Sequence, residues 1–532
     1  MADDGQRPKT LRRYDKAAER RRAWDGILDD AYRFALPNHD PRGNQSPGKQ
    51  RDVEVFDNTA VAAVQWRKAR LHGQLFPPFR KWMDFTIQGD DPGDDDQIKA
   101  YLAKAQEAFH QAIEVSNFHI EIDPALGDAC ISTGCLMIHQ GTPEDPLRFE
   151  AVPIAQLIPE EGLDGTLRTM FRHWSLPLRQ IREKWPDAKR PEQIKQRDDP
   201  DAPITVIEAI LHEGDIARYE VWATDTGQGQ GSGARLMLER NYQTSPAIAF
   251  RMDKAPGEWM GRGPVLNVLG DIKTANKLVE LVLKNASIAV TGMWQADDDG
   301  VLNTANIKLV PGTIIPKAPG SGGLQPLKAP GDFNVSQILL EPLQENIRRG
   351  IMGPALPPTR EGVRTATEID ARVAEHEAFE LPISLRLLNE LDYPLARRVI
   401  AILSSPAMAG SPYYIEPLER NGQELRPVPV SPLVRLQDRA EAAQAGQAYA
   451  AGLQMMGDII GGVVNRPTFL RHSLTQAGFP PEHLLSEDQA AQYEAQVRHA
   501  QAQMQAQERM KQERMKQERM EQEAEQREGG HE

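Results

Sequence analysis

The sequence predicts an α+β fold that is largely helical. Apolar residues recur at helical spacing in residues 11–82 and again after residue 263, whereas short runs of strand-forming residues occupy residues 136–250. Helices and strands are therefore segregated along the chain, which is typical of the α+β class. With 532 residues, the chain can supply roughly three or four domain-sized units with an ample core.

The first helical region carries two apolar stripes, which are separated by a polar connector at residues 37–50. The stripes consist of Tyr14, Ala17, Trp24, Ile27, Leu28, Ala31 and Tyr32, and of Val61, Val64, Ala69 and Leu71. A basic cluster accompanies the first stripe and contains Arg12, Arg13, Arg20, Arg21 and Arg22. This cluster could contact nucleic acid. A solvated helix face is favoured, because carboxylates such as Asp15 and Asp25 are interleaved with the arginines.

An acidic turn at residues 90–96 separates a predicted strand at 84–87 from a predicted helix at 97–115. Three consecutive carboxylates, at residues 94–96, could suggest a metal site. Calcium loops need regularly spaced ligands and a closing glutamate, which this turn lacks. We therefore expect these aspartates to favour the start of the following helix through its dipole.

The β-rich region should contain several strands and one short helix. The strands are expected at residues 136–139, 147–153, 167–174, 204–212, 219–223, 235–239 and 247–250, and the helix at residues 178–185. The only cysteines of the chain, Cys130 and Cys135, lie just before the first strand. Their spacing supports neither a disulfide framework nor a zinc site, so we expect small buried thiols.

A long amphipathic helix is predicted at residues 264–290. Pro264 can open it, because the first-turn N–H groups of a helix have no partner within the helix. The apolar stripe consists of Val265, Leu269, Ile272, Val279 and Leu283, with Asn276 as its only polar interruption. Over roughly 26 residues the helix extends about 40 Å. Its other face is charged, so the helix borders water or a polar partner and cannot cross a bilayer.

Two further helices follow after a Gly/Pro-rich segment with short β-type runs at residues 292–331. Helical spacing returns at residues 335–351, where Pro342 should either kink the helix or mark its real start. A proline-rich loop then leads to a third helix at residues 365–404. This helix should be interrupted near its prolines at positions 382 and 394.

The C-terminal part begins with a proline-rich transition at residues 406–432, after which helical spacing returns at 433–464 and 467–478. Residues 487–528 contain almost no helix breaker and could form a helix of about 60 Å. Methionines recur there at five-residue steps, which do not form a heptad seam, so a self-contained dimeric coiled coil is disfavoured. A charged single helix ordered by its neighbours and a frayed polar tail both remain open.

The sequence contains no phosphate-binding loop, no His-Glu-x-x-His pair and no nucleophile elbow. The nearest imitation, Glu375-His376-Glu377, has Glu380 where a second histidine would be needed. We therefore expect no catalysis, no metal and no cofactor. The formal net charge of −14 disfavours a simple cationic nucleic-acid binder, so any DNA contact should be loose and non-specific. No apolar run reaches transmembrane length.

Several short segments, taken in order, resemble a known family. These segments are Leu75-Phe76-Pro77 followed by Lys81-Trp82, Ser116-Asn117-Phe118, residues 128–138 with Thr133-Gly134, Gly261-Arg262-Gly263-Pro264, and Thr365-Ala366-Thr367-Glu368-Ile369. Their order resembles that in the portal, or head-to-tail connector, proteins of short-tailed, podovirus-type bacteriophages. The resemblance covers roughly Tyr14 to Gln444 and leaves the C-terminal part less secured.

The resemblance implies a phage portal fold of wing, stem, clip and crown, with a long C-terminal barrel helix and assembly into a dodecameric ring. The implied divisions are an N-terminal α+β wing region at 1–263, a first stem helix at 264–290, a clip at 291–330, a second stem helix at 331–351, a tunnel loop at 352–364, a wing helix at 365–405, a crown region at 406–485 and a barrel helix at 486–532.

The implied function is a channel at a capsid vertex through which double-stranded DNA is packaged and ejected. The ring would also be the docking platform for terminase and a tail adaptor, and would contact the major capsid or scaffold protein. Arg360 and Arg364 of the tunnel loop would touch DNA phosphates or, equally, pair with acidic residues of a neighbouring subunit. Trp294 would anchor a partner at the clip or belong to the clip core.

The implied location is the portal vertex of the virion, after synthesis in the host cytoplasm. The alternative is a non-channel structural scaffold or tail component of a virion, which would share the absence of catalytic motifs and the long helical tail. A closed ring with a central pore distinguishes the portal from this alternative.

Overall fold

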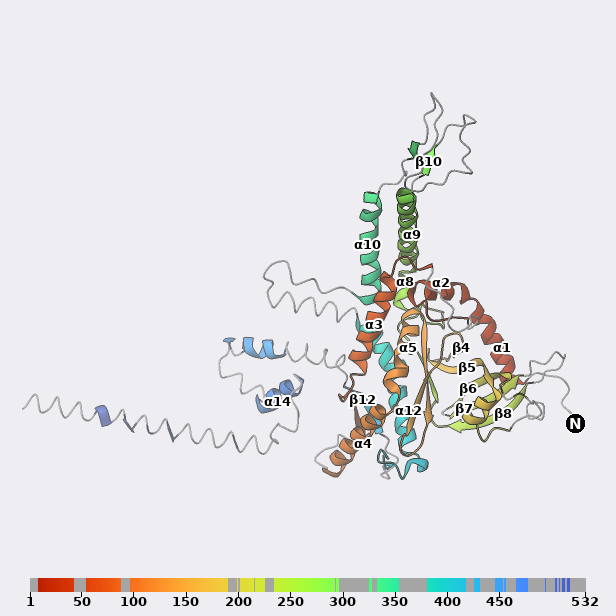
Figure 1. Cartoon of the computed structure of the whole chain (residues 1–532). Coiled ribbons are helices and arrows are strands. Elements are labelled where there is room, and N and C mark those ends of the chain that lie inside the picture. Colours follow the sequence, from red (N-terminus) through yellow and green to blue (C-terminus); the bar gives the residue numbers. More distant parts are fainter. Residues whose placement is uncertain are drawn as a thin grey trace, which may run out of the picture. The chain divides into compact units, whose positions relative to one another are not determined.

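The structure is a computed structural model. It describes residues 8–42, 54–87, 96–189, 199, 201–214, 216–224, 234–291, 293–295, 325–327, 333–353, 380–417, 425–430, 445–452, 454–455 and 466–476, with single residues and short stretches between 493 and 516. Two compact units divide the chain, Met1–Leu433 and Val434–Glu532. The first contains both helices and sheets, as the predicted α+β class requires (Figure 1). In the second, α14 spans Arg466–Gln476, and the Phe469 ring lies 5.2 Å from that of Tyr449.

Five helices precede most of the strands. They are α1 (Lys9–Arg22), α2 (Asp25–Ala35), α3 (Thr59–Leu75), α4 (Asp96–Val115) and α5 (Phe118–Ile131). Of the arginines in the basic cluster of α1, Arg21 is paired with Asp25, one of the interleaved carboxylates. Arg13 and Arg20 are instead paired with Glu160, which is distant in the sequence. No helix in the described ranges has both the length and the apolar composition of a membrane span.

The largest sheet has five antiparallel strands in the order β4-β5-β6-β7-β8. Its strands are β4 (Leu157–Glu161), β5 (Leu167–Pro177), β6 (Pro203–Glu213), β7 (Ile216–Thr224) and β8 (Arg235–Tyr242), and α6 (Leu178–Lys184) follows β5. On one face, Leu11 and Ala17 of α1 pack against residues of β4 to β7, and the main core covers the other. Burial on both faces explains why β6 reads as a nearly continuous apolar run and not as a strict alternation.

A second sheet has three antiparallel strands in the order β3-β2-β9, namely β3 (Leu147–Ala151), β2 (Thr133–Gln140) and β9 (Ala247–Arg251). The predicted strands of the β-rich region are all present. The sequence did not predict β4, because its central proline and two glutamates break the strand pattern. It also did not predict β12 (Leu425–Pro429), a proline-containing strand that pairs antiparallel with β1 (Met83–Ile87).

An aromatic cluster fills the core beneath α3, α4 and α5. The ring of Phe76 lies edge-to-face on Trp82 and Phe118, with centroid distances of 4.9 Å and 5.1 Å. Phe118 in turn contacts Phe149 of β3 at 5.0 Å, so the cluster joins the helices to the three-stranded sheet. Each such pair stabilises the core by about 1 kcal/mol beyond its buried area.

Both cysteines are free and buried, as predicted. Burial raises the pKa of each thiol, Cys130 and Cys135, to about 12. Neither is therefore a reactive thiolate. Residues 88–95, which contain most of the acidic turn, lie outside the described residues. In the part of the chain that is described, no cluster of three His, Cys, Asp or Glu residues could hold a metal ion.

The third predicted helix is described from residue 380. Residues 380–387 are helical, η3 (Leu388–Asp392) is a π turn, and α12 spans Tyr393–Leu403. Pro382 lies in the first turn of this described segment, and the residues before 380, where an interruption would show, are outside the described residues. Near Pro394, the helix widens into the π turn of η3 instead of breaking.

Asp392, the last residue of this π turn, is fully buried. Neither of its carboxylate oxygens has a hydrogen-bond partner among the described residues. Burial without a partner raises the pKa of this carboxyl well above its ordinary value. The helix therefore contains a buried acid that is favoured in its neutral form.

We expect Asp392→Asn to stabilise the protein near neutral pH. Because the folded-state pKa is raised, wild type loses stability as the pH rises from the ordinary carboxyl pKa of 3.8 towards the raised value, whereas asparagine has no proton to release. The midpoint of heat unfolding should be higher in the variant at pH 7, and the difference should shrink as the pH falls towards 4. A difference independent of pH would contradict this assignment.

Candidate functional site

Two long helices, α9 (Leu269–Thr291) and α10 (Phe333–Met352), contact each other side by side and are called the stalk below (Figure 1). With 23 and 20 residues, they extend about 35 Å and 30 Å. A short helix, α8 (Pro264–Asn267), precedes α9, so the predicted single helix is broken at Val268. Pro342 lies inside α10 and does not mark its start.

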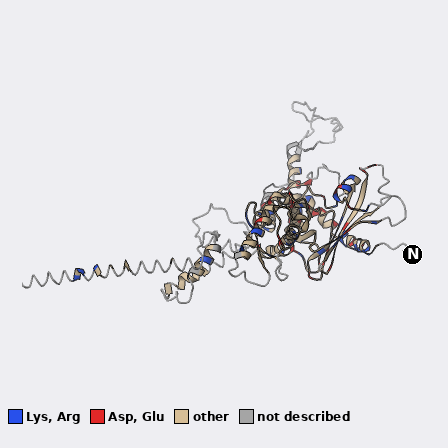
Figure 2. Cartoon of the chain, turned by 90° about the horizontal axis from the view of Figure 1, so that it is seen from below, with Lys and Arg blue, Asp and Glu red and all other residues tan. Residues whose placement is uncertain are grey.

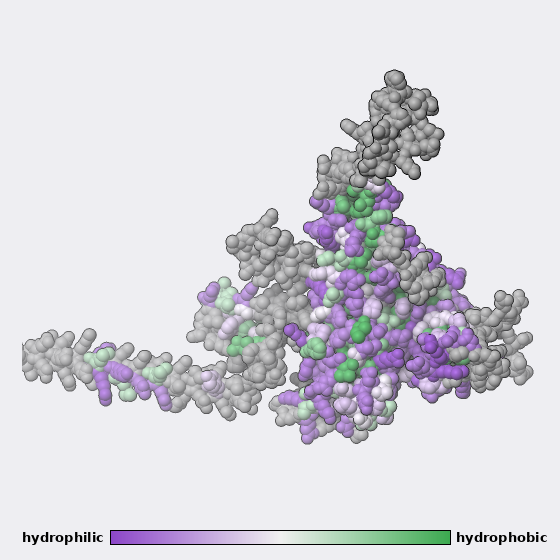
Figure 3. Space-filling view, in the orientation of Figure 1, coloured by the Kyte–Doolittle hydropathy of each residue, from purple (hydrophilic) through white to green (hydrophobic). Residues whose placement is uncertain are grey.

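Apolar side chains of the stalk are buried at its base and exposed farther out. At the base, Ile272 of α9 and Ile347 and Ile351 of α10 are buried. Farther from the base, Leu281, Leu283 and Leu339 are each more than half exposed. Figure 3 shows hydrophobic residues at the surface of the stalk. Leu283 lies on the predicted stripe of α9, whereas Leu281 lies about 200° around the helix from it, so exposed leucines occupy two faces of α9.

Asn276, the polar interruption of the stripe, fastens α9 to the segment before α3. The side-chain oxygen of Asn276 accepts hydrogen bonds from the backbone N–H groups of Phe56 and Asp57, at 2.7 Å and 3.1 Å. Its side-chain nitrogen donates to the carbonyl of Glu54 at 3.0 Å. A buried amide needs hydrogen-bond partners for both its oxygen and its nitrogen, and here the backbone of residues 54–57 supplies them. Asn276 therefore fixes the position in which α9 docks.

The second stalk helix is attached to the same turn. Gln344 of α10 donates from Nε2 to Asp57 Oδ1 at 3.2 Å. Near the end of α10, Gly350 lies so close to Val268 that an added Cβ would be 2.3 Å from Val268 Cγ1. The absence of a side chain at Gly350 therefore permits the close approach of α10 to the α8–α9 junction.

Charged side chains on the outer faces of the stalk are paired with each other. Lys277 and Lys284 both contact Glu280, at 3.0 Å and 2.5 Å, and the hydrogen bond from Lys284 is the main reason that the pKa of Glu280 is lowered. On α10, Arg349 contacts Glu345 at 3.0 Å. These lysines and this arginine are therefore already partly neutralised, so this part of the stalk is a poor tight-binding surface for phosphates.

Beneath the stalk, a buried ion pair joins α3 to the helix that begins the 380–403 segment. Arg67 Nη2 donates to Glu380 Oε2 at 2.7 Å, and Nη1 contacts the other oxygen. The two side chains are only 1% and 4% exposed. In the sequence, Glu380 stands where a metal motif would need a second histidine. In the structure, its carboxylate neutralises the buried guanidinium of Arg67.

A second buried pair centres on Arg251 of β9. Its Nη2 donates to Glu390 Oε1 at 2.7 Å, and its backbone N–H and Nε donate to Oε2 of the same carboxylate at 2.9 Å and 3.1 Å. The remaining donors reach the carbonyls of Trp259 at 2.9 Å and Gly165 at 2.7 Å, and Glu161 at 3.2 Å. The guanidinium is therefore satisfied on all sides although it is fully buried.

The structure describes the backbone of one of the three predicted site residues, Trp294. Arg360 and Arg364 are outside the described residues. Trp294 belongs to β10 (Met293–Gln295), which pairs antiparallel with β11 (Gln325–Leu327), and its register partner is Pro326. Sequence reasoning missed Asn276, Arg67 and Arg251 as framework residues. The only available signal was a polar residue within an apolar stripe, at Asn276.

Comparisons with known proteins agree on one family. The sequence model described as "Bacteriophage head to tail connecting protein" matches residues 7–485. The probable portal protein of Bordetella phage BPP-1 is 20% identical over 518 residues, which are 92% of this chain and 91% of that protein. The portal protein of Enterobacteria phage T3 is 22% identical over 471 residues, 84% of this chain and 82% of that protein. The portal protein of Escherichia phage T7 is 20% identical over 425 residues, 76% and 75% of the two chains.

Among solved structures, chains from the virion of a native gene transfer agent particle and from the neck of an empty one are similar. They share 12% and 14% identity with this chain, and each match covers 76% of this chain and 92% of the other. The TM-score is 0.30 for both, which is too low to support an argument about the fold.

The buried pair of Arg67 and Glu380 gives a prediction about stability. Glu380→Gln should lower the free energy of unfolding by about 3–5 kcal/mol, because it leaves a buried guanidinium without its counter-ion. The double variant Arg67→Leu/Glu380→Leu should lose much less, since it buries no charge. Urea unfolding of the two variants measures the difference. Equal losses would show that the ion pair is not the source of the effect.

Proposed function

The chain belongs to the bacteriophage head to tail connecting protein family, and from this premise we propose that copies of it close into a ring around a DNA channel. It is a portal protein, which acts at the capsid vertex of a phage. Packaging and ejection of the viral genome follow from that identity. The arrangement of the ring, its dodecameric copy number and the roles of single residues are our proposal.

In this proposal, the stalk is the stem of the portal and contributes one wall segment per copy. Residues 291–330, which include β10 and β11, form the clip, and residues 352–364 form the tunnel loop. Residues 1–263 and 365–405 form the wing, residues 406–485 the crown, and residues 486–532 a barrel helix. The side-by-side packing of α9 and α10, with β10 and β11 between them in sequence, supports this division.

The observation that carries the ring is the set of exposed leucines on the outer part of the stalk. Leu281, Leu283 and Leu339 lie on two helices whose bases are already fixed by Asn276 and Gln344. A rigid pair of helices with half-exposed leucines can bury them only against another surface. In a ring, each stalk meets two identical neighbours, so the same residues are covered in every copy without a different partner.

DNA would pass this wall without being held. Lys277, Lys284 and Arg349 are paired within their own helices, which leaves little positive charge on them for sliding phosphates. Arg360 and Arg364 would provide the transient contacts, either to phosphates or to acidic residues of the next copy. The protein itself would perform no catalysis and hold no cofactor, so the packaging energy would come from a terminase that docks at the clip.

The clip would also receive a tail adaptor, with Trp294 as a contact, and the outer surface would meet the major capsid or scaffold protein. Electron micrographs of the purified protein test the central proposal. Closed rings with an opening wide enough for duplex DNA are expected. Monomers or filaments would instead favour a scaffold or tail component that never encloses DNA.

The stalk gives a quantitative prediction. In Leu281→Gln/Leu283→Gln/Leu339→Gln, each substitution removes about 1 kcal/mol of apolar burial between copies, so together they should weaken ring assembly about 100-fold. Mass photometry across protein concentrations measures this change. Heat unfolding of the single chain should barely change, because the leucines are already half exposed. Lys284→Gln, on the same helix, should assemble like wild type.

A second prediction concerns the tunnel loop. Arg360→Ala/Arg364→Ala should leave rings intact and reduce retention of packaged DNA, because the transient phosphate contacts are lost. Packaging assays with matched rings measure the DNA retained. Unchanged retention in intact rings would reject the phosphate role. Loss of the rings themselves would favour pairing with a neighbouring copy.

A further inference from the structure

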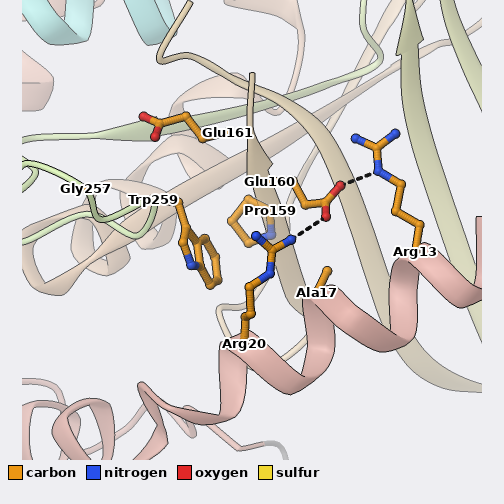
Figure 4. A pocket seen from close by; sticks show the side chains of 8 residues that line it. All are labelled: Arg13, Ala17, Arg20, Pro159, Glu160, Glu161, Gly257 and Trp259. Atoms are coloured by element: carbon orange, nitrogen blue, oxygen red, sulfur yellow. Dashed lines mark hydrogen bonds and ion pairs between the residues drawn. The ribbon is translucent and has the colours of Figure 1, made fainter. Parts of the chain in front are cut away.

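A surface pocket of about 330 Å³ lies where α1 crosses the edge of the five-stranded sheet. Its walls are Arg13, Ala17 and Arg20 from α1, Pro159, Glu160 and Glu161 from β4, and Gly257 and Trp259 from the loop before α8 (Figure 4). None of the roles proposed above for the stalk, clip or tunnel loop uses this pocket. It is therefore a separate feature of the fold.

One nearly buried carboxylate positions two exposed guanidinium groups at this pocket. Glu160 accepts from Arg13 Nε at 2.5 Å and from Arg20 Nη2 at 2.8 Å, as the dashed lines in Figure 4 show. The Glu160 side chain is 10% exposed, whereas Arg13 and Arg20 are 48% and 60% exposed. Arg13 Nη2 also donates to Thr169 Oγ1 at 3.2 Å. The two arginines are thus held in place while most of each head group faces solvent.

The charge at this place is not balanced locally. Each guanidinium carries five N–H donors, and the bonds to Glu160 and Thr169 use two donors of Arg13 and one of Arg20. Glu161 does not compensate, because it is turned away from the arginines and contacts Arg251 and Lys254. Two positive charges therefore face one carboxylate, beside the apolar wall of Trp259.

The pocket lies on a strongly basic helix of an acidic chain. α1 contains seven basic and two acidic residues, whereas the whole chain has a formal net charge of −14. Lysine and arginine residues are coloured blue in Figure 2, which shows them along the helices near the N-terminal end. With 76 acidic and 62 basic residues, a second copy of the chain carries a net negative charge, which is complementary in sign to this helix.

We propose that the Arg13–Arg20 pocket receives an Asp or Glu side chain from a second copy of this chain. The inference rests on the proposed ring and adds a specific contact to it. A side chain on a polypeptide segment can enter a recess between a helix and a strand, with its carboxylate on the guanidiniums and its stem against Trp259. The phosphates of a duplex remain on the outside of a stiff rod and fit a protruding basic surface better than a recess.

The test uses two variants that should change the protein concentration at half-assembly in opposite directions. Arg13→Gln/Arg20→Gln removes both cations and should raise the protein concentration at half-assembly about tenfold at low salt. Glu160→Gln frees the two arginines for the incoming acid and should lower that concentration. If the pocket only stabilises the fold, both variants break the same intrachain ion pairs, and assembly should respond to them in the same direction. Mass photometry from 50 mM to 500 mM NaCl measures assembly, and the difference between variants should vanish at high salt.

Arg12→Gln/Lys16→Gln is the matched control, since it removes the same charge from α1 outside the pocket wall. Equal weakening by this control would show a general electrostatic effect and overturn the pocket assignment. Hydrogen exchange of residues 9–22 provides a second measurement, because the proposal expects more protection in rings than in single chains. If wild type never assembles, the ring proposal fails. If rings form and the Arg13→Gln/Arg20→Gln variant assembles like wild type at every salt concentration, only the pocket inference fails.

Discussion

The guanidinium of Arg251 joins three segments that are distant in the sequence, residues 251–259, 161–165 and 390. It extends from β9 of the three-stranded sheet and contacts Glu390 in the π turn, Glu161 at the edge of the five-stranded sheet, and the carbonyls of Gly165 and Trp259. A fully buried cation is tolerated only when its donors are satisfied and its charge is compensated. Both sheets and the long helix must therefore be in place together, which makes this residue the constraint on which the body of the first unit depends.

The same region determines how the stalk leaves the body. The loop after β9 passes Trp259, and Gly261 and Gly263 approach the backbone of Ser132 and Cys130 so closely that no side chain would fit. Pro264, the residue after Gly263, then begins α8. The start of the stalk is thus fixed by backbone packing, and its direction by Asn276, whose amide binds residues 54–57. A pair of helices whose base is fixed in these ways presents its outer leucines in one defined orientation.

Periodicity was sufficient to predict most helices and strands, because amphipathic stripes and strand runs are local in the sequence. It failed where local rules were broken for tertiary reasons. β12 contains two prolines and forms only because β1 offers an antiparallel partner, and Pro342 lies within a helix that the pattern could not place with certainty. The ion pair of Arg67 and Glu380 joins residues 313 positions apart, and nothing in either neighbourhood indicates the other. The resemblance carried the functional assignment, whereas the pocket between Arg13, Arg20 and Glu160 could be found only in three dimensions.

The pairing of β1 with β12 has a consequence for biosynthesis. One strand is made early and the other only near the end of the first unit, so a nascent chain cannot complete this sheet until almost the whole unit has left the ribosome. Contacts between such distant segments form slowly. A polypeptide cut short by premature termination would lack β12 and would expose the unpaired edge of β1, which favours aggregation and proteolysis.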